Sequence, residues 1–124
     1  MAKKKGLTYE EKMINALNTL PNPLEDTKHR IFIIFENDRA RSGQSRFEHI
    51  IMPRHELKPT DIQRISKKIN VSILRMDKER TNTYNLYVPR YSYKKEYIKL
   101  SLELDFRKSN IGKVKTIYIT KSLK

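Results

Sequence analysis

Apolar and polar residues alternate through residues 97–106, and this pattern constrains the fold more than any other part of the sequence. The apolar members occupy every second position: Ile98, Leu100, Leu102, Leu104 and Phe106. Such alternation is typical of an antiparallel strand with one face on the core and the other in solvent. A turn over residues 107–112 leads into a last extended segment, residues 113–121. Residues 71–76 and 83–90 precede it with only short turns between them, and strands joined this closely are expected to be neighbours in a meander.

The first half of the chain predicts two helices and two further extended segments. Thr8-Tyr-Glu-Glu11 has the pattern of a capping box, and apolar residues at helical spacing follow it until Pro21 ends the helix. A second helix is expected to begin near Pro59 or Thr60, where Thr60-Asp-Ile-Gln63 again fits a capping box. The extended segments are residues 30–35, a buried strand, and residues 46–52, a shorter one. Residues 24–29 are interpreted as a polar connector.

Together these elements predict an α+β fold. It consists of an N-terminal helix, then a helix packed on a twisted antiparallel sheet of four to five strands. At 124 residues the chain forms a single domain, because it is too short for two cores. In the last strand, strict alternation places Val114, Thr116, Tyr118 and Thr120 on one face. This face is unusually polar and could line an open groove of the sheet.

Positive charge is concentrated in the second half of the sequence. The net charge is +13, and residues 1–62 have 11 Lys and Arg against 9 Asp and Glu, whereas residues 63–124 have 16 against 5. A field of this sign attracts polyanions, so we expect a nucleic acid as the partner. The alternative is that lysines simply keep the surface soluble.

Composition excludes several other classes of protein. With no cysteine there is neither a disulfide framework nor a thiolate metal site, and three histidines without metal-binding spacing predict no metal and no other cofactor. The basic start, residues 1–5, has no apolar stretch after it and so is not interpreted as a signal peptide. No apolar run approaches the roughly 18 residues of a membrane span. We therefore expect a cytoplasmic protein without a membrane partner.

Titratable side chains gather in residues 47–62. His49 and His55 lie there with Arg54 between them, and Glu48 and Glu56 are their neighbours. Imidazoles, a guanidinium and carboxylates ahead of a helix are the groups that acid–base chemistry on a phosphodiester requires. Each histidine could instead be a structural residue with satisfied hydrogen bonds.

Tyrosines and cations are interleaved in the following strands. Five tyrosines fall within fourteen residues: Tyr84, Tyr87, Tyr91, Tyr93 and Tyr97. Arg90, Lys94 and Lys95 lie among them. Aromatic rings stack on unpaired bases while cations hold phosphates, so the cluster favours RNA or single-stranded DNA. For any single tyrosine the simpler interpretation is a residue that suits a sheet.

The order of these features resembles the barnase–EndoU–colicin–RelE-like nuclease superfamily, above all its phage and mobile-element branches. The resemblance rests on three short motifs: His49-Ile-Ile-Met-Pro-Arg-His55 before a helix, Tyr87-Val-Pro-Arg90 in a middle strand, and Thr116-Ile-Tyr118 in the last strand. It covers residues 46–121, which would form the nuclease-like core, whereas residues 1–45 would be an N-terminal helix and strand extension.

The resemblance implies a metal-independent endoribonuclease, either a toxin or a phage-borne effector, that leaves a 2′,3′-cyclic phosphate and a 5′-hydroxyl. His49 and His55 would then be the acid–base residues, with Arg54 and Arg90 as phosphate clamps. The residues expected to bind the substrate are Tyr87, Thr116, Tyr118 and Lys121. A cognate inhibitor is a further partner that such a protein could have.

Two other interpretations remain open from the sequence. The chain could be a non-catalytic nucleic-acid-binding accessory protein that uses the same basic sheet. It could also be a phage-encoded inhibitor of a host ribonucleoprotein. Only the nuclease requires the histidines and arginines to converge on one cleft.

Overall fold

The computed structural model describes residues 6–91 and 94–123, so the basic start of the chain and Tyr93 lie outside the described residues. The fold is α+β, as predicted. Its helices and strands, in chain order, are α1 (Tyr9–Thr19), β1 (Leu24–Asp26), β2 (Ile31–Ile34), α2 (Arg46–Ile50), α3 (Pro59–Lys67), β3 (Ile73–Met76), β4 (Thr83–Pro89), β5 (Tyr97–Glu103) and β6 (Ile111–Thr120). Short 3-10 turns lie at Pro53–His55 and Ile69–Val71.

The sheet has six strands in the order β1-β2-β6-β5-β4-β3. The predicted meander of β3 to β6 is confirmed, with every neighbouring pair antiparallel. The expectation of four to five strands, all antiparallel, is wrong in its details. Strand β1 forms within the supposed connector and pairs with β2, and β2 runs parallel to β6. This parallel pair is possible because α2, α3 and strands β3 to β5 separate β2 from β6 in sequence, which is the long crossover that parallel strands need.

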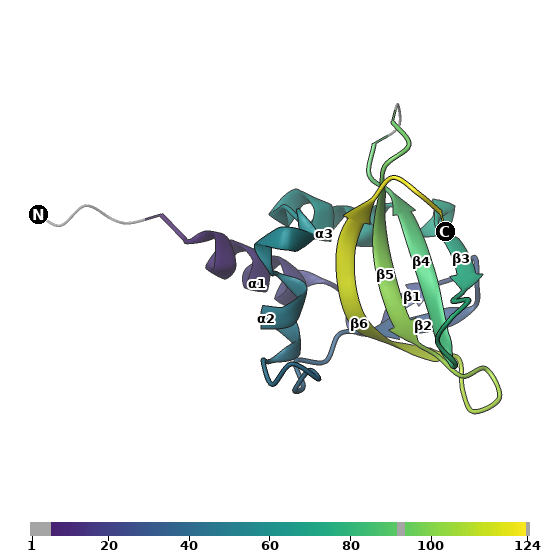
Figure 1. Ribbon diagram of the computed structural model, residues 1–124. Helices are drawn as coiled ribbons and strands as arrows, with labels where there is room; N and C mark the ends of the chain where they lie inside the picture. Colours follow the sequence, from purple (N-terminus) through teal and green to yellow (C-terminus); the bar gives the residue numbers. More distant parts are fainter. Residues whose placement is uncertain (1–5, 92–93, 124) are drawn as a thin grey trace, which may run out of the picture.

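The sheet is curled, and β1 and β2 lie behind β4 and β5 in the view of Figure 1, with the helices gathered beside β6. One cluster of buried apolar residues fills the space between these elements. Its members come from both halves of the chain and include Met13, Leu17, Ile31, Ile33, Ile62, Ile65, Leu100 and Ile117. Elements α1, β1 and β2 therefore share their core with the meander. None of the helices in the described ranges has the length and apolarity of a membrane span.

Helix α2 replaces the strand expected at residues 46–52. Ser45 caps it: its hydroxyl accepts a hydrogen bond from the Glu48 N–H at 3.2 Å, and the Glu48 carboxylate accepts from the Ser45 N–H at 3.2 Å. This reciprocal capping box fixes the first turn of the helix. The buried residues Phe47, Ile50 and Ile51 have helical spacing, and so the strand prediction was wrong.

The other helices begin at residues close to those expected. Helix α1 has the predicted capping box of Thr8 and Glu11. Helix α3 begins at Pro59, and its start is capped by Asp61, which accepts a hydrogen bond from the Lys58 N–H at 2.9 Å. The capping box predicted at Thr60 is therefore two positions too late, because the observed N-cap is Lys58 and the third helical residue is Asp61.

A β-bulge near Lys115 changes which residues of β6 share a face. Ser101 of β5 lies opposite Thr116, but its neighbour Leu102 lies opposite Val114, so Lys115 is the extra residue. Because a bulge shifts the alternation by one residue, Val114 joins Ile117 in the core. The prediction that Val114 shares a face with Thr116 and Tyr118 was wrong for this reason.

Candidate functional site

The face of the sheet that points away from the core carries a row of polar and aromatic side chains. Tyr87 of β4 lies opposite Lys99 of β5, and Lys99 lies opposite Tyr118 of β6. In the next row, Ser101 lies opposite Thr116. We call this surface the polar face and define it by Asn85, Tyr87, Tyr97, Lys99, Ser101, Thr116, Tyr118 and Thr120.

A cleft of about 660 Å³ lies over one end of the polar face. Ser101 and Thr116 line it from the sheet, Arg46 and His49 line it from α2, and the turn between β3 and β4 lines the opposite side. The ionic residues in its wall are Arg41, Arg46, Arg80 and Lys115 against Glu79 and Glu103. The excess of positive charge favours an anionic ligand over a neutral one.

The two histidines predicted to act together are neighbours beside this cleft. Their ring centroids are 5.8 Å apart in an edge-to-face arrangement, and the His55 ring lies 6.2 Å from the ring of Tyr118. The Nδ1 atom of His55 is 2.7 Å from the carbonyl oxygen of Ile50. Because a carbonyl oxygen only accepts, Nδ1 carries the proton of this hydrogen bond, and Nε2 is the nitrogen left for chemistry.

His49 lines the cleft and is biased toward its neutral form. Burial lowers its pKa below the usual value of 6.5, and the positive charges of His55, Arg46 and Arg54 lower it further. Its Nδ1 atom is buried and has no hydrogen-bond partner in the described part of the chain. A buried nitrogen of this kind costs free energy unless a bound molecule or water satisfies it.

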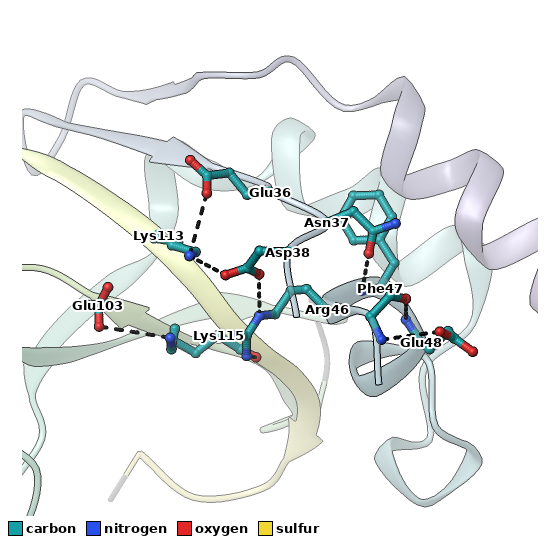
Figure 2. Close-up of polar contacts among 10 residues, drawn as sticks. Glu36, Asn37, Asp38, Arg46, Phe47, Glu48, Glu103, Lys113 and Lys115 are labelled. Atoms are coloured by element: carbon teal, nitrogen blue, oxygen red, sulfur yellow. Dashed lines mark hydrogen bonds and ion pairs between the residues drawn. The ribbon is translucent and has the colours of Figure 1, made fainter. Parts of the chain in front are cut away.

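Arg46 is held at the wall of the cleft by contacts that Figure 2 shows. Its Nε donates to Asp38 at 2.9 Å, and its Nη1 donates to the carbonyl oxygen of Lys115, the bulge residue, at 3.1 Å. The second Asp38 oxygen accepts from Lys113, and these two cations hold the pKa of Asp38 far below its usual range. The remaining N–H groups of Arg46 have no partner within the described residues and are available to an anion.

Arg46 was not among the residues predicted for the site. The signal that could have found it is the capping box of Ser45 and Glu48. Once this box predicts a helix, Arg46 becomes its first residue and His49 follows one turn later on the same side. The Phe47 N–H donates a hydrogen bond of 2.8 Å to the side-chain oxygen of Asn37, and this bond also ties the turn to the segment after β2 (Figure 2).

Lys99 was also missed, although it lies at the centre of the polar face. Its Nζ is 5.2 Å from the ring centroid of Tyr118 and 5.7 Å from that of Tyr87. Burial opposes its charge, but hydrogen bonding to Tyr118 and the proximity of both phenols outweigh it and raise the pKa of Lys99. The residue therefore brings a fixed positive charge between two aromatic rings.

The remaining predicted residues are divided by the fold. Thr116 lines the cleft, whereas Arg54 and Lys121 are exposed and lie outside its lining. Tyr87 belongs to the polar face, but its side chain is fully buried. Arg90 is not brought to the cleft: it is only 8 % exposed and donates two hydrogen bonds to Asp61 of α3, at 2.9 and 3.1 Å.

The acidic neighbours of the histidines and the third histidine have other contacts. Glu48 belongs to the cap of α2, and Glu56 is exposed. His29 lies near β1, where its Nδ1 is 2.6 Å from the carboxylate of Asp26. Within the described ranges no group of three or more His, Cys, Asp or Glu side chains has the arrangement to hold a metal ion.

Comparison with protein-family models, with curated proteins and with solved structures gives no match to this chain.

Proposed function

We propose that the protein binds RNA on its polar face and cleaves it without a metal ion. The observation that carries this proposal is the contact of His49 with His55, 5.8 Å between ring centroids, at the wall of a cationic cleft. RNA carries its own nucleophile, the ribose 2′-hydroxyl, next to each phosphorus. Its cleavage therefore needs one proton acceptor, one proton donor and positive charge around the phosphate.

The environments of the two histidines suggest their roles. His49, whose pKa is lowered by burial and by its neighbours, would be neutral and would accept the proton of the 2′-hydroxyl. His55 would donate a proton from Nε2 to the departing 5′-oxygen, because its Nδ1–H is held by the Ile50 carbonyl. A histidine biased to its neutral form, next to a second histidine whose Nδ1–H is already engaged, is an arrangement that acid–base catalysis can use.

Arg46 and Lys99 would supply the positive charge. The guanidinium of Arg46 is already oriented by Asp38 and by the Lys115 carbonyl, so little side-chain order remains to be lost when a phosphate binds. Lys99 and Tyr118 would contact the nucleotide next to the scissile phosphate, with the phenol ring as a stacking surface. Exposed Arg54 and Lys121 could contact more distant phosphates.

The experiment is an incubation of pure protein with end-labelled RNA in EDTA, followed by analysis of the product ends. We expect a 2′,3′-cyclic phosphate and a 5′-hydroxyl, and no cleavage where a single 2′-deoxy nucleotide replaces the cleaved one. His49→Gln and His55→Gln should each lower the rate by about 10²- to 10⁴-fold. His29→Gln is the matched control, because His29 lies outside the cleft and should leave the rate unchanged.

A non-catalytic RNA-binding protein is the second candidate, favoured by the partly exposed pair of Lys99 and Tyr118 on the polar face. RNA that is bound but stays intact with the wild-type protein would refute the nuclease and support this candidate. The wild-type protein should then retard RNA on a native gel. Weaker binding by the Lys99→Gln and Arg46→Gln variants would locate the interaction on the polar face and at the cleft over it. Either protein would act in the cytoplasm, as a toxin or accessory factor of a mobile element.

A further inference from the structure

Most of the positive charge of the second half of the chain lies outside the cleft. Residues 63–124 have 16 basic against 5 acidic side chains, yet only Arg80 and Lys115 of this excess line the cleft, together with Glu79 and Glu103. Most of the basic side chains of residues 63–124 must therefore lie on other parts of the surface. Two stretches of the sequence, residues 62–76 and 89–95, contain no acidic residue at all, and the fold brings them together.

The ring of Tyr91 is the point where these stretches meet. The guanidinium of Arg64 on α3 is 5.7 Å from the ring centroid, that of Arg90 is 5.2 Å away, and the Lys94 amine is 5.7 Å away. Two hydrogen bonds to buried Asp61 hold the Arg90 side chain in place, and Asp61 also contacts Arg64 at 3.3 Å. Asp61 thus orients two arginines around one partly exposed aromatic ring.

The cationic surface continues along α3. Lys67 and Lys68 follow Arg64 by three and four residues, so they extend from the same side of the helix. Both are exposed, and neither forms an ion pair within the described ranges. We call Arg64, Lys67, Lys68, Tyr91 and Lys94 the basic platform. Its like charges repel one another along the helix, which lowers helix stability unless an anion is bound.

The platform lies at the end of the sheet where β4 ends, β5 begins and β6 ends. The contact of His55 with Tyr118 lies near the same end. Pro89, the last residue of β4, pairs with Tyr97 of β5, and Tyr97 pairs with Thr120, two residues beyond Tyr118. Arg90 and Glu96 then close this end with a backbone hydrogen bond of 2.9 Å. In Figure 1 this end is at the top, next to α3. The turn that carries His55, Pro53–His55, also leads directly into α3.

We propose that the basic platform binds the sugar–phosphate backbone of an RNA strand whose neighbouring segment occupies the cleft. The identification of the strand as RNA rests on the proposed function. Arg64 and Lys94 meet at the Tyr91 ring, and Lys67 and Lys68 continue the row at the end of α3, which suits successive phosphates better than a single small anion. The Tyr91 ring offers a stacking surface for an unpaired base, so the platform suits a single strand.

The test measures the affinity for a fully 2′-O-methylated RNA of about 20 nucleotides, longer than a typical single-strand site, at several salt concentrations. The blocked 2′-oxygen prevents cleavage during the measurement. The variant is Lys67→Gln with Lys68→Gln, and the matched control is Lys12→Gln with Lys108→Gln. The control removes the same charge from exposed lysines on α1 and in the turn after β5.

The measured quantity is the slope of log K, the binding constant, against the logarithm of the salt concentration. We expect this slope to be shallower by about 1.4 in the platform variant, or roughly 0.7 for each lost phosphate contact on a single strand. Between about 50 and 200 mM salt, it should thus lose about sevenfold less affinity than the wild type. The control should keep the wild-type slope. Tyr91→Leu should weaken binding at every salt concentration without changing the slope, because it removes stacking and no charge.

The outcomes separate this proposal from the previous one. If the wild-type protein binds RNA and the platform variant has the slope of the control, the platform is refuted and the cleft proposal stands. If the platform variant weakens binding of a dinucleotide, which is long enough only for the cleft, the effect is a general loss of charge and the platform is also refuted. If the wild-type protein neither binds nor cleaves RNA, the proposed function fails and the platform loses its ligand.

Discussion

Replacing Arg90 by methionine should destabilise the protein without removing a group from the cleft. Arg90 is 8 % exposed and Asp61 is 1 % exposed, and they share two hydrogen bonds of 2.9 and 3.1 Å. Methionine keeps much of the apolar stem of the side chain but leaves the Asp61 carboxylate buried with fewer partners. The pair also connects β4 to α3, because Asp61 caps that helix at Lys58.

The expected loss in the free energy of unfolding follows from this arrangement. Removing one partner of a buried ion pair costs about 3–5 kcal/mol, because the other charge remains without compensation. Here Asp61 keeps its hydrogen bond from the Lys58 N–H and a longer contact with Arg64, so the lower part of this range, about 3 kcal/mol, is expected. In the double variant Arg90→Met with Asp61→Asn, the neutral amide can still cap the helix, and part of the loss should be recovered.

Urea denaturation of the four proteins of this double-mutant cycle measures the coupling directly. We expect Arg90→Met to have a much lower midpoint, and the double variant to be more stable than the sum of the single effects. Arg54→Met is the control for a matched substitution at an exposed arginine and should change stability by less than about 0.5 kcal/mol. A loss of less than about 1 kcal/mol for Arg90→Met, or strict additivity in the cycle, would refute the interpretation of a buried structural pair.

Three further outcomes follow from the structure. His49→Gln should flatten the acid side of the stability profile. The pKa of His49 is lowered on folding, so the unfolded chain takes up a proton as the pH falls below about 6.5 while the folded chain resists it, and the wild-type protein loses stability there. Urea midpoints at pH 5 and 7 would show a smaller loss in the variant. An equal pH dependence of both proteins would contradict the prediction. Ser45→Ala should cost about 1 kcal/mol through the loss of the α2 cap, measured by the same method, and no loss would mean that α2 is held by its other contacts alone. Leu100→Ala, in the middle of the sheet at 0 % exposure, should cost about 2–5 kcal/mol, and a loss below 1 kcal/mol would show that the core collapses around the missing atoms.

Local signals in the sequence predict the meander and the first helix well. The alternation in β5 and the capping box of Thr8 and Glu11 each depend on residues close together in the chain. Strand β1 has no such signal, because its three residues become a strand only by pairing with β2. The parallel pair of β2 and β6 joins segments about 80 residues apart, and nothing in either segment specifies that partner.

The candidate site was only partly accessible from the sequence for a similar reason. The contact of the histidines was expected from their spacing, although the segment between them is a helix and a tight turn and not the end of a strand. The position of Val114 depends on the bulge at Lys115, and a bulge has no reliable pattern in a strand of alternating residues. The carbonyl that orients Arg46 belongs to Lys115, the extra residue of this bulge.

Arg46 and Arg90 show why the sequence could not distinguish a cleft cation from a structural one. Both are buried and each is paired with one aspartate. Arg90 engages both oxygens of Asp61 through Nε and Nη2 and also contacts Glu96, so its charge is matched within the protein. Arg46 shares Asp38 with Lys113, which also pairs with Glu36 at 3.5 Å, and part of the Arg46 guanidinium has no partner in the described ranges. Under the proposed function, this unpaired part of the guanidinium at the cleft wall, and not burial or the residue type, is what distinguishes Arg46 from Arg90 as a phosphate ligand.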